Sequence, residues 1–181
     1  MKTVYFDIDT QLDFMVPSGS LYVPGAEQIV GEVARLNRKA AVDGSLVIST
    51  MDAHSEDDPE FKLWPRHCVL GALGQRKVSA TLLDGAVTIP NSPDLADWRG
   101  APQLLLEKQT VDCFTNPNLT VILREWNAAT YVVYGVVTEI CVRNAVVGLL
   151  PFGKPIHVVR SAIQHLEEEK ASAFLSSVSV I

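Results

Sequence analysis

Hydrophobic residues fall into two kinds of run that alternate along this chain. Short, mostly apolar runs typical of buried strands lie at residues 4–8, 45–49, 104–107, 131–134 and 156–159. Segments with apolar residues at helical spacing lie at residues 26–41, 118–126, 141–150 and 167–177. Strands that alternate with helices predict an α/β protein with a mainly parallel sheet covered on both faces.

One segment, residues 51–74, has no clear period and is rich in Asp, Pro, His and Gly. A connection this long inside a folded domain is usually functional or disordered. Parallel sheets place their sites at the carboxyl ends of strands, beside the point where the strand order reverses. We therefore expect the chemistry at strand ends and in this segment.

Composition narrows the classes of protein that fit. The 181 residues are enough for a single domain, residues 1–181, and the net charge of −6 gives no support for nucleic-acid or anionic-membrane binding. No secretion signal and no apolar run near the ~20 residues that span a bilayer is visible. The three cysteines are an odd number without disulfide-framework spacing. These features predict a cytoplasmic protein, and we expect a homo-oligomer.

Cys141 follows an apolar strand run that ends at Gly135, and a helix-like run begins at the cysteine itself. A thiol in that place faces helix-terminal N–H groups, which would stabilise a thiolate and could hold an oxyanion. The pattern favours a nucleophile; an inert, buried cysteine is the alternative.

Two charged residues lie at other predicted strand ends. Asp9 ends the first strand, where its carboxylate could accept the proton of a thiol, although a turn cap is an equal alternative there and at Asp13. Lys108 follows the strand at residues 104–107, where an ammonium group would lower a thiol pKa and fix a carboxylate. A surface lysine is the alternative.

The long segment contains Asp52 and His54 just past a strand end, and His67 can return from its far side. Two imidazoles and a carboxylate suit Zn²⁺, Fe²⁺ or Mn²⁺. A polar surface loop with unrelated histidines is the alternative, and Cys68 is interpreted as packing under the loop.

Taken together, these segments resemble the nicotinamidase branch of the isochorismatase-like cysteine hydrolases, in the same order and over nearly the whole chain. The resemblance is carried by Asp-Thr-Gln-Leu-Asp-Phe at residues 9–14, by residues 107–114 around the lysine and by residues 135–142 around the cysteine. The most specific match is Trp-Pro-Arg-His-Cys-Val-Leu-Gly at residues 64–71, because it distinguishes metal-binding nicotinamidases from isochorismatases without the metal.

The resemblance implies a three-layer, Rossmann-like α/β/α fold and hydrolysis of an amide C–N bond. Cys141 would attack the carbonyl carbon, Asp9 would act as base and then protonate the ammonia, and Lys108 would orient Asp9 and favour the thiolate. The backbone N–H groups of Val137 and Cys141 would hold the oxyanion. The Val136–Val137 bond matches a cis peptide bond of the family.

The resemblance also implies the substrate contacts. Phe14 and Trp64 would enclose an aromatic ring, and one divalent metal, zinc before iron or manganese, would bind the pyridine nitrogen of nicotinamide. Glu60 stands where some relatives place a further metal ligand. The predicted function is therefore a nicotinamidase of NAD salvage that acts on a small-molecule amide.

The chain departs from the family pattern at two places that affect the substrate. Val137 replaces a smaller residue, usually Ala, and residues 71–75 lack a Thr that is usual after the first Gly. The added bulk of Val137 narrows the pocket, so a related amidase for another small amide or ureido compound is the alternative enzyme. A non-catalytic binding protein is a further alternative, against which the intact Asp9, Lys108 and Cys141 argue.

Overall fold

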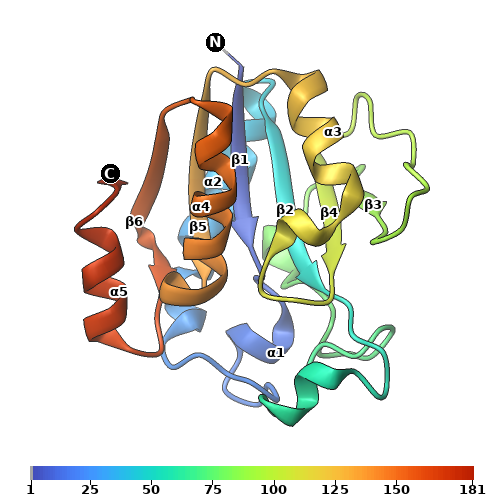
Figure 1. Ribbon diagram of the computed structural model, residues 1–181, viewed down its shortest axis with the longest axis vertical. Helices are drawn as coiled ribbons and strands as arrows, with labels where there is room; N and C mark the ends of the chain where they lie inside the picture. Colours follow the sequence, from blue (N-terminus) through green and yellow to red (C-terminus); the bar gives the residue numbers. More distant parts are fainter. Residues whose placement is uncertain (1) are drawn as a thin grey trace.

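The computed structural model describes residues 2–181, and its centre is a seven-stranded sheet with the order β3-β4-β2-β1-β5-β6-β7 (Figure 1). Every neighbouring pair of strands is parallel, which confirms the predicted sheet type. The strands are β1 (Thr3–Ile8), β2 (Leu46–Asp52), β3 (Val87–Ile89), β4 (Gln103–Lys108), β5 (Thr130–Val136), β6 (Ile156–Gln164) and β7 (Ser179–Val180).

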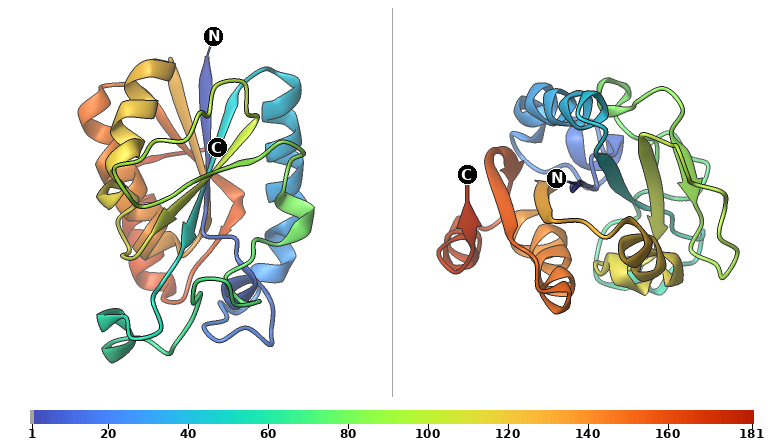
Figure 2. Two further views of the ribbon diagram at one scale, coloured as in Figure 1. Left: turned by 90° about the vertical axis from the view of Figure 1, so that its right-hand side faces the viewer. Right: turned by 90° about the horizontal axis from the view of Figure 1, so that it is seen from above.

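Helices cover both faces of the sheet and form the outer two of three layers (Figure 2). The α-helices are α1 (Leu12–Met15), α2 (Val30–Val42), α3 (Pro117–Trp126), α4 (Arg143–Leu149) and α5 (Glu168–Leu175). Helix α2 packs on one face, while α3, α4 and α5 supply buried side chains to the hydrophobic cluster on the other. The predicted α/β/α fold is confirmed. No helix within residues 2–181 is long and apolar enough to cross a membrane.

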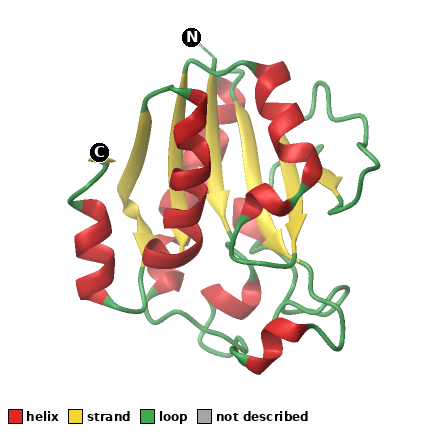
Figure 3. Cartoon of the chain, in the orientation of Figure 1, coloured by secondary structure: helices red, strands yellow, loops and turns green. Residues whose placement is uncertain are grey.

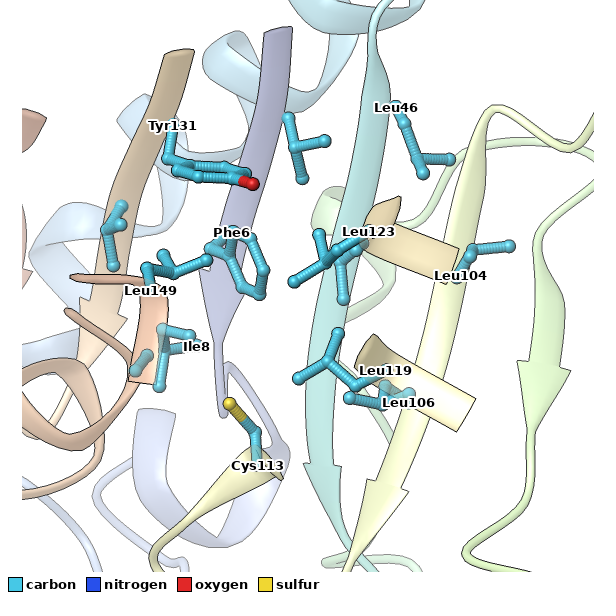
Figure 4. Close-up of a cluster of buried hydrophobic side chains, with 14 of the residues drawn as sticks. Phe6, Ile8, Leu46, Leu104, Leu106, Cys113, Leu119, Leu123, Tyr131 and Leu149 are labelled. Atoms are coloured by element: carbon cyan, nitrogen blue, oxygen red, sulfur yellow. The ribbon is translucent and has the colours of Figure 1, made fainter. Parts of the chain in front are cut away.

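Strand β1 shows why the sheet is buried on both sides. Phe6 and Ile8 point to the α3–α4 side, where they lie among Leu119, Leu123 and Leu149 (Figure 4). Tyr5, directly before Phe6 in the strand, points to the α2 side. Each of these large apolar side chains stabilises the fold by about 1.5–3 kcal/mol when fully buried. The two faces of the strand therefore anchor it, and with it Asp9 at its end.

Four predicted strands, β2, β4, β5 and β6, continue past their predicted ends, and the extensions of β2 and β4 concern the site. Strand β2 continues to Asp52 and β4 to Lys108, and these two residues are partners in the parallel register. Hydrophobic patterning placed Asp52 and Lys108 outside the strands because it treats such charged side chains as exposed. Here the opposite charges of the pair allow both side chains to be buried.

The prediction of one helix over residues 141–150 is wrong in its start. A π-type turn, Thr138–Val142, precedes α4, so Cys141 lies inside this turn and not at a helix N-terminus. The segment 26–41 is likewise divided into a 3₁₀ turn, Ala26–Ile29, and α2. The short strands β3 and β7 were not predicted, because two or three residues carry no readable period.

Candidate active site

Four of the predicted site residues lie at the carboxyl edge of the sheet. Asp9 follows β1, Asp52 ends β2, Lys108 ends β4, and Cys141 lies in the turn after β5. These strands are neighbours in the sheet and end at the same edge (Figure 3). Strand β1 pairs with β2 on one side and β5 on the other, so the site lies where the strand order reverses, as expected for such sheets.

Lys108 joins two buried carboxylates. Its Nζ lies 3.0 Å from Asp9 Oδ2 and contacts Asp52 Oδ1. The Lys108 and Asp9 side chains are each 1% exposed. Asp9 Oδ1 accepts a 2.5 Å hydrogen bond from the Thr50 hydroxyl, and the Asp9 backbone has a φ of 50° in the left-handed region. These contacts fix Asp9, and the cap interpretation does not apply to it. Asp13 instead accepts hydrogen bonds from the backbone N–H groups of Ser20 and Cys68, so it joins two loop segments and does not cap its own turn.

The environment gives the two carboxyl groups opposite protonation tendencies. Burial, with Asp52 adding to it, raises the pKa of Asp9 even though Lys108 opposes the shift. Burial acts in the same direction on Asp52, but Lys108, His54 and His67 outweigh it and hold its pKa below the usual range. The pKa of Lys108 would fall on burial, but the two carboxylates raise it well above its ordinary value. Such a divergence marks Asp9 as the group suited to exchange a proton.

Cys141 is half-buried and lines a pocket. Burial raises the pKa of its thiol well above the ordinary value; Lys108 lowers it, and the Asp9 carboxylate raises it further. The predicted influence of Lys108 is therefore present, but burial outweighs it, and the net shift of the pKa favours the thiol over the thiolate. A base must remove the thiol proton during attack, and Asp9 is the nearby carboxylate with a raised pKa.

The turn before Cys141 has the backbone features that the resemblance implies. The Val136–Val137 peptide bond is cis. The Val137 carbonyl accepts hydrogen bonds from the N–H groups of Ile140 and Val142, both at 3.1 Å. It accepts none from the N–H of Cys141, which lies between these two residues in the chain. A side chain at Gly135 would lie 2.1 Å from the Ile8 carbonyl oxygen, so only glycine lets β5 approach β1 this closely.

Asp52, His54 and His67 converge, with one ligand atom from each within 4.8 Å of the others. Asp52 Oδ2 lies 3.8 Å from His54 Nε2 and 3.6 Å from His67 Nε2. His54 Nε2 is buried and has no hydrogen-bond partner among residues 2–181. A buried, unpaired ring nitrogen beside a carboxylate and a second imidazole fits a divalent metal such as zinc.

Glu60 is not one of the converging side chains. It lies in a 3₁₀ turn, Pro59–Lys62, and lines the same pocket as Asp52 and His67. Its role as a ligand stays a prediction. Sequence reasoning also missed Asp58, whose Oδ2 lies 3.0 Å from His54 Nδ1. The available signal was its position directly before Pro59, which is typical of a residue that caps a helical turn.

The pocket itself has apolar walls and encloses about 390 Å³ of free space including its mouth, at the small end for ligand sites. Phe14 and Trp64 both line it, and the Phe14 ring centroid lies 5.4 Å from that of His67. The remaining apolar lining consists of Leu21, Val23, Val111, Val137, Ile140 and Leu166. Cys141, Asp52, His67 and Glu60 supply the polar groups. This arrangement suits a small, flat, largely apolar molecule with one polar end.

Several solved structures share this architecture. A pyrazinamidase of Pyrococcus horikoshii in complex with zinc superposes with a TM-score of 0.82 and 25% identity over 100% of this chain and 99% of that one. A pyrazinamidase/nicotinamidase of Streptococcus mutans superposes with a TM-score of 0.83 and 26% identity, over 99% of this chain and 100% of that one. An N-carbamoylsarcosine amidase of Thermoplasma acidophilum superposes with a TM-score of 0.80 and 26% identity, over 99% of this chain and 95% of that one.

Sequence comparison points to the same family as the solved structures, but the curated relative it finds is named as inactive. A probable inactive nicotinamidase of Arabidopsis thaliana is 28% identical over 149 residues, which are 80% of this chain and 71% of that protein. The sequence model of the isochorismatase domain matches residues 3–180. Since that match covers nearly the whole chain, the protein belongs to the isochorismatase family of hydrolases.

Proposed function

We propose that this protein is a metal-dependent cysteine amidase that hydrolyses nicotinamide to nicotinate and ammonia. The observation that carries the proposal is the buried contact between Lys108 and Asp9 beside Cys141, on the same pocket as the converging Asp52, His54 and His67. The reaction would place the protein in NAD salvage in the cytoplasm.

The first half of the reaction forms a thioester. Asp9 takes the proton of the Cys141 thiol as the sulfur attacks the amide carbon, and the carbonyl electrons move onto oxygen. The N–H groups of Val137 and Cys141 face that oxygen, a contribution of roughly 3–4 kcal/mol per donor in other enzymes. When the carbonyl re-forms, the C–N bond breaks, and Asp9 passes its proton to the nitrogen so that ammonia leaves.

The second half releases the acid. Asp9 removes a proton from water as the water oxygen attacks the thioester carbon. When the carbonyl re-forms, the C–S bond breaks and Asp9 passes that proton to the sulfur, which returns Cys141 as a thiol and Asp9 as a carboxylate. Lys108 keeps Asp9 available as a base, because its ammonium group opposes the rise in the Asp9 pKa that burial causes. Phe14 and Trp64 hold the ring. A divalent ion bound by Asp52, His54 and His67 would supply a coordination position for the ring nitrogen.

A second substrate class has one specific observation in its favour. Val137 lines the pocket and is 8% exposed, so its two methyl groups occupy space beside Cys141. A linear ureido compound needs less room there than a six-membered ring, and the Thermoplasma acidophilum neighbour is named as an N-carbamoylsarcosine amidase. The Arabidopsis thaliana relative, named as a probable inactive nicotinamidase, raises the question whether this chain is active at all. The presence of Asp9, Lys108 and Cys141 together in one site supports activity.

Ammonia release measures these alternatives directly. We expect kcat/KM for nicotinamide to exceed that for benzamide by tenfold or more, since about 1.4 kcal/mol of ring-nitrogen binding suffices for that ratio. N-carbamoylsarcosine and acetamide complete the panel, and Cys141→Ala is the background control. Equal rates for nicotinamide and benzamide, or a preference for a linear compound, would refute the nicotinamidase proposal and retain the cysteine amidase. No ammonia from any amide would refute both.

A further inference from the structure

His54 is enclosed on every side, and its backbone is held by the loop around it. Its side chain has no exposed area. The His54 N–H donates to the Cys68 carbonyl at 3.1 Å, and its own carbonyl accepts from Leu70 N–H at 2.9 Å. With the backbone held, the ring presents Nε2 toward Asp52 and Nδ1 toward Asp58.

Both oxygens of Asp58 are engaged. Oδ1 accepts a 2.9 Å hydrogen bond from the Glu60 N–H and so caps the 3₁₀ turn, while Oδ2 lies 3.0 Å from His54 Nδ1. The side chain is only 10% exposed. Neither ring nitrogen of His54 has an aligned hydrogen-bond partner within residues 2–181, but Nδ1 lies 3.0 Å from Asp58 Oδ2, whereas Nε2 lies 3.8 Å from Asp52 Oδ2. Because an ionised carboxylate cannot donate, a proton on Nδ1 is the arrangement that avoids two lone pairs facing each other at 3.0 Å. A neutral ring with its proton on Nδ1 has a lone pair on Nε2, the atom that faces Asp52 and lacks a partner within residues 2–181.

We infer that Asp58 is a positioning residue for the metal centre, which fixes the His54 tautomer and aims its Nε2 lone pair at the point where Asp52 and His67 converge. This inference rests on the metal dependence in the proposed function. Carboxylate partners of metal-binding histidines typically contribute 10–100-fold to metal affinity. The Phe61 ring, centred 5.3 Å from the His54 ring and 5.8 Å from the His67 ring, packs edge-on against both and leaves them little room to turn.

The test uses zinc alone and needs no substrate. The full chain is freed of metal with a chelator, and the zinc Kd is measured at pH 8 by competition with a chromogenic chelator. Asp58→Ala removes both contacts, whereas Asp58→Ser keeps a hydroxyl that can cap the turn but is too short to reach His54. The neighbouring exposed Asp57 provides the control, Asp57→Ala.

We expect Asp58→Ala and Asp58→Ser to weaken zinc binding by about 10–100-fold and Asp57→Ala to leave it unchanged. If Asp58→Ser binds zinc like the wild type while Asp58→Ala does not, Asp58 acts only as a turn cap and the inference is refuted. Unchanged binding by Asp58→Ala, or no zinc binding by the wild type, refutes it too.

A second readout requires no variant to fold. ¹⁵N NMR of the metal-free wild type should show the His54 proton on Nδ1 and an unprotonated Nε2, and the reverse tautomer would overturn the inference. Neither measurement depends on turnover, so both can test the role of Asp58 even if nicotinamide proves not to be a substrate.

Discussion

Replacing Lys108 by methionine removes the one ammonium group that contacts both Asp9 and Asp52, and keeps a side chain of similar length. The three side chains are 1%, 1% and 5% exposed, so water cannot replace the lost ammonium without rearrangement. The substitution leaves two carboxylates in a buried site without a counter-charge.

The magnitude follows from the cost of such a change. Breaking a buried ion pair by removing one partner destabilises a protein by about 3–5 kcal/mol. In a domain of this size, each kcal/mol lowers Tm by roughly 2–4 °C, so Lys108→Met should lower Tm by about 6–20 °C. In the wild type, the lowered pKa of Asp52 contributes stability above the unfolded carboxyl pKa, and that stability is lost as pH falls through the folded pKa.

The variant should have the opposite pH dependence. Without Lys108, burial raises the carboxyl pKa values above those of the unfolded chain, and the charged forms become unfavourable as pH rises through them. The difference in Tm between wild type and Lys108→Met should therefore be larger at pH 8 than at pH 5. Thermal unfolding followed by circular dichroism at both pH values measures it.

Lys39→Met is the matched control. Lys39 also forms an ion pair, 2.6 Å from Asp43, but the two side chains are 51% and 44% exposed. Water and salt screen that pair, so its loss should change Tm little. Equal changes in Tm for the two variants, or a Lys108→Met effect that does not vary with pH, would refute the buried-pair reasoning.

Three further outcomes follow from the site and the elements beside it. Because burial raises the pKa of Asp9, kcat/KM for nicotinamide should fall with acid at a pH above the ordinary carboxyl range; a pH profile that stays flat to about pH 4, near the ordinary Asp pKa, would contradict this. Val137→Ala should raise kcat/KM for nicotinamide relative to acetamide, and an unchanged ratio would show that Val137 does not limit ring size. Glu139 Oε1 accepts hydrogen bonds from the N–H groups of Leu166 and Glu167, at 2.9 and 2.7 Å. Glu139→Ala should therefore lower the free energy of unfolding, measured with denaturant, by about 1.5–3 kcal/mol, and Glu139→Gln should lower it less. Equal losses for the two variants would argue against a charge-assisted contact.

Much of the fold could be predicted because its strands are long apolar runs. Apart from Asp7, residues 4–8 and 131–134 are apolar on both faces of the sheet, as expected for strands buried between two layers of helices. The carboxyl ends of these strands then indicated Asp9 and the turn before Cys141. Residues 64–71 added the metal-type motif, and the three donors do converge.

What sequence reasoning missed depends on contacts between distant residues. Asp52 and Lys108 are buried at the ends of their strands, where their opposite charges meet across the sheet, a contact that no local pattern reports. Burial around Cys141 reverses the predicted shift of its pKa, and no local pattern reports that burial. The link from Asp58 to His54 required the turn at Pro59–Lys62, which no hydrophobic period reveals.

The central claim is that Cys141 is the nucleophile of an amidase. Ammonia release from nicotinamide by Cys141→Ala, measured beside the wild type at equal concentration, tests it most directly. The account predicts a loss on the order of 10⁴-fold or more, with Tm close to that of the wild type, since losing a nucleophile removes covalent catalysis while the fold persists. Turnover by Cys141→Ala near the wild-type rate would contradict the account.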